Sequence, residues 1–346
     1  MPVSVVVGGQ FGSEGKGKVA FHVARTRRAT AVVRVGGPNS GHTAVDADGS
    51  VWVFRQLPAA ALARDALIIL PAGSLIDPQL LLAEIERLNV PRERLLIDSR
   101  ASVVLPHHRE QELTEGLDDR IGSTASGTGA ALRDRISRSP NHVLAADHPS
   151  TKPYVCESCS ETLRSLLIQG NRVVIEGTQG FGLSLWHGSD YPYLTSRDTT
   201  AAGFVAEAGL APHDVDEVIM VLRSFPIRVG GNSGRLEREI DWATVAEQAR
   251  LPSDYVELTS ATKRIRRVAR FDPRIVRRAI AANAPHRIVL NHLDYVDPDV
   301  IGEGLGLKAR QFIQEVEFAI GQEIDLAGLS PSILVAARSE QIRAAI

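Results

Sequence analysis

Cysteine is almost absent from the 346-residue sequence, and its two cysteines, Cys156 and Cys159, form a single C-x-x-C motif. Four ligands complete a structural zinc site, so this motif without a second pair supplies at most half of one. Redox-active C-x-x-C pairs belong to a thioredoxin-like sequence context, which is missing here. We therefore expect two free thiols in a reducing compartment.

The sequence also lacks an excess of charge of one sign and any long apolar run. Its 39 Lys and Arg residues nearly balance 41 Asp and Glu, giving a net charge of −2. This balance favours neither a nucleic-acid-binding protein nor a membrane-surface protein. No apolar run approaches the length of a membrane span, and no basic segment precedes an apolar one at the N-terminus. We predict a cytoplasmic protein that binds neither membranes nor nucleic acids.

The most informative segment is a glycine-rich loop that follows the first apolar run. Residues 5–7 predict a buried strand, residues 8–18 a phosphate-binding loop with two lysines, and the apolar residues from Val19 onward the start of a helix. Residues 12–18 fit the G-x-x-x-x-G-K spacing of a P-loop. However, Val19 stands where an ordinary P-loop carries the Ser or Thr that holds magnesium. The sequence therefore predicts a variant P-loop in which another group holds the metal.

Apolar strands alternate with amphipathic helices along the rest of the chain. Asp77 and Pro78 are typical of a helix N-terminus, and Leu81, Ile85 and Leu88 form the apolar stripe of that helix. The alternation predicts an α/β fold, a variant of the P-loop NTPase type, with a mostly parallel central sheet flanked by helices and long ligand loops. We find no domain boundary and expect one domain over residues 1–346. The further predicted strands are residues 31–35, 51–54, 67–70, 95–97, 172–175, 218–222 and 288–290, and a further helix covers residues 311–320.

Several loops between these elements are rich in Gly, Ser, Thr, Asn and Gln, notably residues 36–43, 122–129 and 176–180. Because loops at the carboxyl ends of parallel strands gather at one edge of a sheet, we expect a single pocket for several anionic groups. Residues 263–278 hold eight basic side chains and a single aromatic residue, Phe271, too few for a base-stacking pattern. Such a run is a solvated face, a nucleic-acid patch or a clamp for anionic small molecules, and the polar loops favour the clamp.

The order of these motifs resembles the adenylosuccinate synthetase family. The resemblance covers nearly the whole chain and rests on residues 12–18, 41–43, 179–180, 191–195 and 264–267. The chain is similar to the compact members of the family rather than to the longer bacterial ones. The resemblance implies that a nucleoside triphosphate phosphorylates the 6-oxygen of a purine nucleotide, after which the amine of L-aspartate displaces the phosphate.

The resemblance also implies a role for each matching residue. His42 is the general acid at the transferring phosphoryl group, and Lys16 and Lys18 neutralise charge. Mg²⁺ is held by Ser13 and the Gly41 carbonyl. Arg138 reaches the monophosphate of the other subunit of a homodimer. The implied catalytic residues are Ser13, Lys16 and His42. The implied triphosphate-binding residues are Gly12, Ser13, Glu14, Gly15, Lys16, Gly17, Lys18, Gly41, His42, Thr43, Arg266, Asn291, His292, Asp294 and Ser330. The implied purine-monophosphate-binding residues are Ser13, Asn39, Ser123, Thr124, Arg138, Gln179, Thr195 and Val229, and the implied aspartate-binding residues are Ser260, Thr262 and Arg264.

Ser13 departs from the family pattern, which has an aspartate there that serves as base for purine N1 and as a magnesium ligand. Serine cannot accept that proton at neutral pH, but its shorter neutral side chain leaves room for a purine 2-amino group. The sequence therefore resembles the phage branch of the family, which joins dGMP to aspartate and makes the succinyl precursor of 2-aminoadenine deoxynucleotides. The acceptor of the N1 proton stays open between the substrate aspartate, a water molecule and Glu14.

Two further positions depart from the family pattern. His292 stands where the family pattern has a lysine, whose aliphatic stem covers the guanine of the GTP that donates the phosphoryl group. The phosphoryl donor is therefore open between GTP and ATP or dATP. Ser126 stands where relatives carry an arginine.

Three other functions are compatible with part of the sequence. The first is ordinary adenylosuccinate synthesis from IMP. The second is a GTP-dependent switch protein, which is disfavoured because Val19 lacks the magnesium hydroxyl and the basic residues 264–267 would have no role. The third is a catalytically inactive nucleotide sensor.

Overall fold

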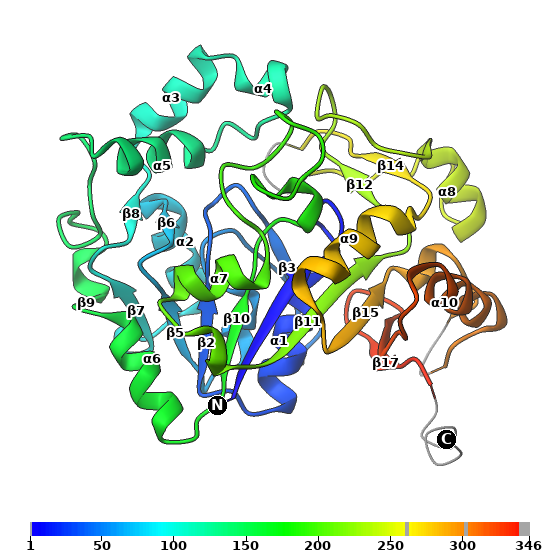
Figure 1. Cartoon of the computed structure of the whole chain (residues 1–346), viewed down its shortest axis with the longest axis horizontal. Helices are drawn as coiled ribbons and strands as arrows, with labels where there is room; N and C mark the ends of the chain where they lie inside the picture. Colours follow the sequence, from blue (N-terminus) through cyan, green and yellow to red (C-terminus); the bar gives the residue numbers. More distant parts are fainter. Residues whose placement is uncertain (1, 260–262, 301–303, 339–346) are drawn as a thin grey trace.

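The computed structural model describes residues 2–259, 263–300 and 304–338 and shows an α/β fold built on one large sheet (Figure 1). Ten strands lie in the order β17-β16-β15-β11-β1-β10-β2-β5-β7-β9. Their neighbours are all parallel except the pair β16–β17. The predicted mostly parallel sheet is thus confirmed. The strands are β1 (Val3–Gly8), β2 (Ala31–Arg34), β5 (Leu67–Leu70), β7 (Leu95–Asp98), β9 (Val155–Cys156), β10 (Val173–Glu176), β11 (Val215–Arg223), β15 (Arg287–Asn291), β16 (Leu326–Gly328) and β17 (Leu334–Ala336).

Helices cover both faces of this sheet because the inner strands present apolar side chains on alternate sides. Val5 and Val7 pack on the face covered by α6, α7, α9 and α10, while Val6 packs on the face covered by α1 and α2. No helix in the described segments has the length and apolarity needed to cross a membrane. The helices are α1 (Lys16–Thr26), α2 (Pro78–Leu88), α3 (Pro106–Thr114), α4 (Leu117–Ile121), α5 (Thr128–Ser137), α6 (Cys159–Ile168), α7 (Ala201–Ala208), α8 (Trp242–Ala249), α9 (Pro273–Asn283) and α10 (Leu307–Ile320).

Short strands form three smaller sheets beside the main one. Two are two-stranded, pairing β3 (His42–Val45) with β4 (Val51–Phe54) and β6 (Leu75–Ile76) with β8 (Ser102–Val103). The third has the order β12-β14-β13 and contains β12 (Ile227–Arg228), β13 (Glu239–Ile240) and β14 (Arg267–Ala269). The strand predicted at residues 51–54 therefore exists, but it pairs with the His42 segment instead of joining the central sheet.

The helix signals in the sequence act as predicted at α2. The Asp77 carboxylate accepts hydrogen bonds from the backbone N–H groups of Gln79 and Leu80, and Pro78 occupies the first helical position. Leu81, Ile85 and Leu88 are buried. Helix α10 begins at Leu307, four residues before the predicted start at 311, and ends at Ile320 as predicted.

Candidate nucleotide site

Five adjacent strands end at one edge of the sheet, and each runs into a polar loop. In sheet order they are β15, β11, β1, β10 and β2, which end at Asn291, Arg223, Gly8, Glu176 and Arg34. This arrangement brings the loops predicted from the sequence together at the carboxyl edge of the strands, where open α/β sheets bind ligands.

The first of these loops, residues 9–15, is held in shape by its own glutamate. The backbone is left-handed at Gly12, Ser13 and Gly15, with φ of 94°, 56° and 91°. The fully buried Glu14 carboxylate accepts hydrogen bonds from the N–H groups of Gln10 (3.2 Å) and Gly12 (2.8 Å). It also pairs with Nζ of Lys16 at 2.6 Å. Glu14 is therefore committed inside the loop, which disfavours it as the acceptor of a purine proton.

The predicted triphosphate residues surround the start of α1. Nζ of Lys18 donates to the Ser330 carbonyl at 2.9 Å, and Nδ2 of Asn291 donates to the Glu14 carbonyl at 2.7 Å. Burial lowers the pKa of Lys18 to about 8, opposed by the charge of Asp294. The structure thus places these residues, which are far apart in the sequence, on one side of the loop.

His292 lies beside this group in a left-handed conformation, with φ of 63°. Its ring packs against Tyr295, with 5.5 Å between ring centroids. Burial and the charge of Arg223 lower its pKa well below the ordinary value, so the ring is neutral at pH 7. Burial raises the pKa of the neighbouring Asp294. A neutral ring therefore occupies the position at which the resemblance to the family leads us to expect a lysine.

His42 belongs to a buried cluster of charged residues. Its Nδ1 lies 2.5 Å from Oε1 of Glu176, and its Nε2 lies 3.1 Å from Oγ of Ser40. Arg34 donates to the same Glu176 oxygen at 3.2 Å, and the N–H groups of Ala59 and Ala60 bind the carboxylate as well. Burial, followed by the charge of Arg34, lowers the pKa of His42 to about 4. The neutral ring therefore carries its proton on Nδ1, toward Glu176, and leaves Nε2 facing Ser40.

The sequence analysis missed Glu176 and Arg34 as partners of His42. Both are charged residues at the carboxyl end of an otherwise apolar, buried strand, β10 and β2. A charged residue at this position lies at the edge of the parallel sheet where ligands bind. A charge at the end of a buried strand is therefore the sequence pattern that indicates both residues.

A cavity of about 370 Å³ opens beside the phosphate loop. Six of the eight predicted monophosphate residues line it, namely Asn39, Ser123, Thr124, Gln179, Thr195 and Val229. The volume is in the range of small-molecule sites. Ser13 and Arg138 are not among the lining residues: Ser13 lies in the adjacent phosphate loop, and Arg138 is exposed at the C-terminal end of α5.

Other lining residues were not predicted. The Phe11 ring lies under the guanidinium of Arg228, which is 4.8 Å from the ring centroid. Burial lowers the pKa of Arg228 to about 10. Glu112 of α3 also lines the cavity. Phe11 lies in the predicted glycine-rich loop but has no polar group that could bind a phosphate, and Arg228 and Glu112 lie outside the loops predicted from the sequence.

The basic run of residues 263–278 divides into separate ion pairs. Arg266 binds Glu257 at 2.6 Å, Arg267 binds Glu239 at 2.6 Å, and Arg274 binds Asp272 at 3.1 Å. Nη2 of Arg264 lies 3.6 Å from Asp118, with the Arg264 side chain 41% exposed. These ion pairs divide the anion clamp that the sequence predicts, so we expect anion binding only at Arg264 and its neighbours and not along the whole basic run. The predicted aspartate-binding residues Ser260 and Thr262 lie outside the described residues.

Magnesium is a hard cation that prefers oxygen ligands, and the residues near the phosphate loop offer few of them. The Ser13 hydroxyl and the Gly41 carbonyl are suitable donors, whereas the Glu14 carboxylate is occupied by Lys16 and the loop amides. These donors fit Mg²⁺ only as part of a set completed by phosphate oxygens and water.

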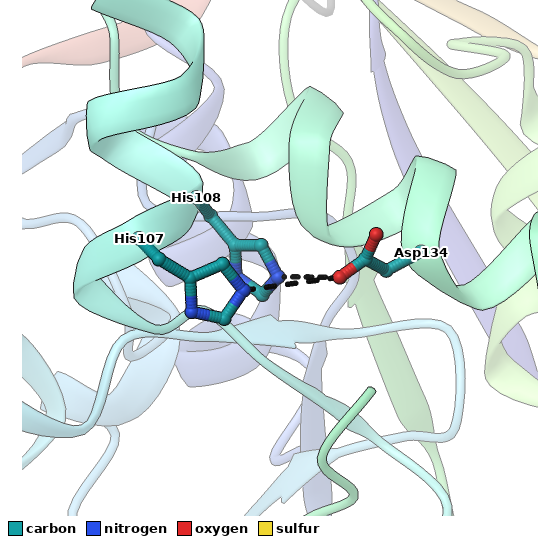
Figure 2. A group of neighbouring side chains, drawn as sticks. All are labelled: His107, His108 and Asp134. Carbon is teal, nitrogen blue, oxygen red and sulfur yellow. Dashed lines mark hydrogen bonds and ion pairs between the residues drawn. The ribbon is translucent and has the colours of Figure 1, made fainter. Parts of the chain in front are cut away.

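Among the described residues, one trio of side chains has the spacing of metal ligands: His107, His108 and Asp134 (Figure 2). Nε2 of His108 lies 3.1 Å from Oδ2 of Asp134, and Nε2 of His107 lies 3.8 Å from it. However, the Leu105 N–H donates to Nδ1 of His108 at 2.9 Å, so the neutral ring carries its proton on Nε2. A metal at Nε2 would require the opposite tautomer. The trio therefore acts as a tie between α3 and α5.

The two thiols are also close together. Sγ of Cys156 lies 3.4 Å from Sγ of Cys159 at the start of α6, and both cysteines are free.

Comparison with known proteins agrees with this geometry. A variant phosphate loop beside a nucleotide-sized cavity at the carboxyl edge of the sheet defines an α/β enzyme that uses nucleotides. The family model described as adenylosuccinate synthetase matches residues 5–152 and 143–301. Curated adenylosuccinate synthetases from Pyrococcus sp. (strain ST700) and Archaeoglobus fulgidus are 37% and 34% identical over 342 and 339 residues, each covering 96% of this chain and 97% of the relative. The chain belongs to the adenylosuccinate synthetase family of C–N-forming ligases.

Two solved structures have the same fold. The succinoaminodeoxyadenylate synthetase of cyanophage S-2L, bound to dGMP and to dATP as an energy donor, superposes with a TM-score of 0.82 at 30% identity, covering 99% of this chain and 97% of that one. The fully ligated adenylosuccinate synthetase of Plasmodium falciparum has a TM-score of 0.83 at 19% identity and covers 97% of this chain and all of its own.

Proposed function

We propose that the chain is a ligase that joins L-aspartate to C6 of dGMP, with cleavage of a nucleoside triphosphate. The product would be 2-amino-2′-deoxy-N6-succinyladenylate, the precursor of 2-aminoadenine deoxynucleotides. The observation that carries this proposal is Ser13: a short neutral side chain replaces the family's acidic one, and the only carboxylate in the same loop, Glu14, is turned inward onto Lys16. The fold-level likeness to the dGMP-bound phage protein supports the same substrate.

In the first step the purine 6-oxygen attacks the γ-phosphorus, and the bond to the β-phosphate oxygen breaks. Lys16 and the loop N–H groups stabilise the charge on the phosphates. His42 donates a hydrogen bond from Nε2 to the transferring group once Nε2 has taken up a proton. The nearby phosphoryl charge raises the proton affinity of Nε2, and Glu176 stabilises the resulting imidazolium through Nδ1.

In the second step the aspartate amine attacks C6, and the C–O bond to phosphate breaks. We assign Arg264 to an aspartate carboxylate, which a planar guanidinium can bind with two hydrogen bonds. Its side chain is 41% exposed and lies 3.6 Å from Asp118. Asn39, Thr124, Gln179 and Thr195 hold the purine monophosphate in the cavity. With Glu14 committed to the loop, the N1 proton leaves in the first step, as O6 attacks phosphorus, and passes to the substrate aspartate or to water. In the second step the attacking amine loses its own proton to the departing phosphate or to water.

Mg²⁺ would be held by the Gly41 carbonyl and the Ser13 hydroxyl together with phosphate oxygens. When bound, it would polarise the γ-phosphoryl group. Ser13 is a weaker ligand than a carboxylate, so the phosphates supply most of the charge that binds the ion.

We propose ATP or dATP as the donor. The neutral His292 cannot cover a guanine as the aliphatic stem of a lysine does. The dATP in the phage structure supports this assignment.

We also propose a homodimer in which Arg138 crosses to the cavity of the other subunit. Arg138 ends α5 in a left-handed conformation (φ 57°) and is exposed, so its guanidinium is free to reach a partner.

The alternative is ordinary adenylosuccinate synthesis from IMP with GTP, which the 37% identity to the archaeal enzymes favours. A matrix of IMP, GMP and dGMP against ATP, dATP and GTP separates the two, with aspartate-dependent phosphate release as the signal and product mass as confirmation. The dGMP assignment predicts the highest kcat/KM for dGMP. Turnover of IMP without turnover of dGMP would replace it with the alternative.

A further inference from the structure

Glu112 is the one carboxylate among the described residues that line the cavity. It lies on α3, and it is only 4% exposed. A carboxylate is an unexpected neighbour for a monophosphate, because the two anions repel each other in a site of low dielectric. Its presence there calls for a function that outweighs the repulsion.

The Glu112 carboxylate binds the first turn of α5. Oε2 accepts from the N–H of Gly127 at 2.8 Å, and Oε1 accepts from the N–H groups of Gly129 (2.8 Å) and Ala130 (3.2 Å). These are N–H groups that a helix start leaves without helical partners, and the negative charge is also favourable at the positive end of the helix. One side chain therefore fixes the start of α5 beside the cavity.

The segment that Glu112 fixes carries the predicted phosphate-binding residues. Residues 122–127 contain three left-handed positions, Gly122, Ala125 and Gly127, with φ of 66°, 47° and 76°. The Ser126 hydroxyl lies 2.9 Å from Oγ1 of Thr124, so a residue that is arginine in relatives here holds a cavity hydroxyl. A loop with so little regular hydrogen bonding depends on an anchor at its end.

A second tie connects the same two helices without touching the cavity lining. The His108–Asp134 hydrogen bond joins α3 to α5 (Figure 2), and the exposed pair Glu115–Arg133 joins them again at 2.7 Å. Because these contacts persist without Glu112, its loss is expected to loosen the loop and leave the helices packed.

We propose that Glu112 is a positioning residue for the monophosphate: it anchors residues 122–127 so that Ser123 and Thr124 face the phosphate. This proposal rests on the proposed assignment of the cavity to a purine monophosphate. It does not depend on which purine is bound.

The test is Glu112→Gln, with Glu115→Gln as the matched control on the same pair of helices. Glutamine keeps the shape but puts an NH₂ group against at least one loop N–H. We expect KM for the monophosphate to rise about tenfold or more, as for the loss of one or two charge-assisted hydrogen bonds. The KM values for aspartate and the triphosphate should stay within about twofold, and the control should match the wild type.

The other outcomes overturn the proposal. A lower monophosphate KM would mean that Glu112 acts only through charge repulsion, and an unchanged KM with a lower Tm would mean that it only stabilises the fold. If the Gln variant does not fold, Glu112→Asp, which keeps the charge but shortens the reach, is expected to show the same selective rise. Calorimetric binding of dGMP and of IMP to both variants separates this result from failure of the proposed reaction, because it needs no turnover.

Discussion

Oε2 of Glu14 lies 2.6 Å from Nζ of Lys16, and both side chains are buried within the glycine-rich loop. The lysine that the P-loop spacing assigns to the phosphates is thus paired with a carboxylate inside the loop. A triphosphate would add a second anionic partner to Lys16, while the Glu14 carboxylate would keep its hydrogen bonds to the N–H groups of Gln10 and Gly12. Neither buried charge would then be left without a partner.

We predict that Lys16→Ala lowers kcat by roughly 10²- to 10³-fold, with a smaller effect on the aspartate KM, because a cation at the phosphates acts mainly in the transition state. Aspartate-dependent phosphate release measures both quantities. Lys308→Ala, which removes an exposed lysine at the start of α10, is the control and should match the wild type. A Lys16→Ala enzyme that keeps wild-type kcat would exclude the proposed role.

The pair His42–Glu176 makes stability depend on pH. The pKa of His42 falls to about 4 in the folded protein from about 6.5 in an unfolded chain. Between these values the unfolded state binds more protons, so this contribution is complete above pH 6.5 and is lost as pH falls toward 4. Its upper limit is roughly 3 kcal/mol. Urea unfolding at pH 7 and pH 5 should show a smaller pH effect for His42→Asn than for the wild type.

His213→Asn is the control for this measurement, because the His213 side chain is 78% exposed. That variant should keep the full pH effect of the wild type. Equal pH effects in His42→Asn and the wild type would show that His42 is not the group responsible.

The sequence predicts those elements of the fold that show a long and regular apolar pattern. The inner strands and α2 follow from continuous apolar runs and from Asp77 with Pro78, which act locally. Strands β9, β16 and β17 were missed because each has two or three residues and pairs only within the completed sheet.

The sequence indicates the parts of the candidate site that lie within one segment of the chain. It does not indicate the contacts that form between segments distant in the sequence. Residues 12–18 and 41–43 indicate a phosphate loop by composition. By contrast, Glu112, Glu176 and Glu257 bind backbone or charged groups 15 to 134 positions away in the sequence. No spacing rule within a single segment contains such a partnership.

The Ser13 assignment makes a prediction about substrate choice. Ser13→Asp restores the acidic residue that the family resemblance implies. The longer side chain does not clash with hypoxanthine, which has no 2-amino group, but it narrows the space for the 2-amino group of guanine. We expect kcat/KM to rise for IMP and to fall at least about tenfold for dGMP, the range expected when one polar interaction with a base is made or broken. Parallel assays with both nucleotides measure the ratio.

Ser253→Asp adds the same charge at an exposed turn and is the control for this change. It should leave the dGMP-to-IMP ratio of the wild type unaltered. A Ser13→Asp enzyme that still prefers dGMP by the original factor would show that another residue selects the purine.

The carboxylate of Glu257 connects three ligand loops. Arg223 binds it at 2.6 Å and also donates to the Ser13 carbonyl at 3.2 Å, Arg266 binds it at 2.6 Å, and the Tyr295 hydroxyl donates to it at 2.8 Å. Although burial opposes ionisation, the charge of Arg223 holds the pKa of Glu257 far below its usual range. The phosphate loop, the basic loop and the loop that follows β15 therefore share one anion.

We predict that Glu257→Gln raises KM for the triphosphate and for aspartate together, each by about tenfold, because a neutral amide leaves the buried Arg223 without its counter-charge and loosens Ser13 and Arg266. KM for the monophosphate should change less than twofold, since the cavity lining does not include Glu257. Glu239→Gln removes the half-exposed partner of Arg267 on the same small sheet and should leave all three constants unchanged. A rise confined to one substrate would show that the loops respond to Glu257 separately, because a shared anion must affect every loop that it holds.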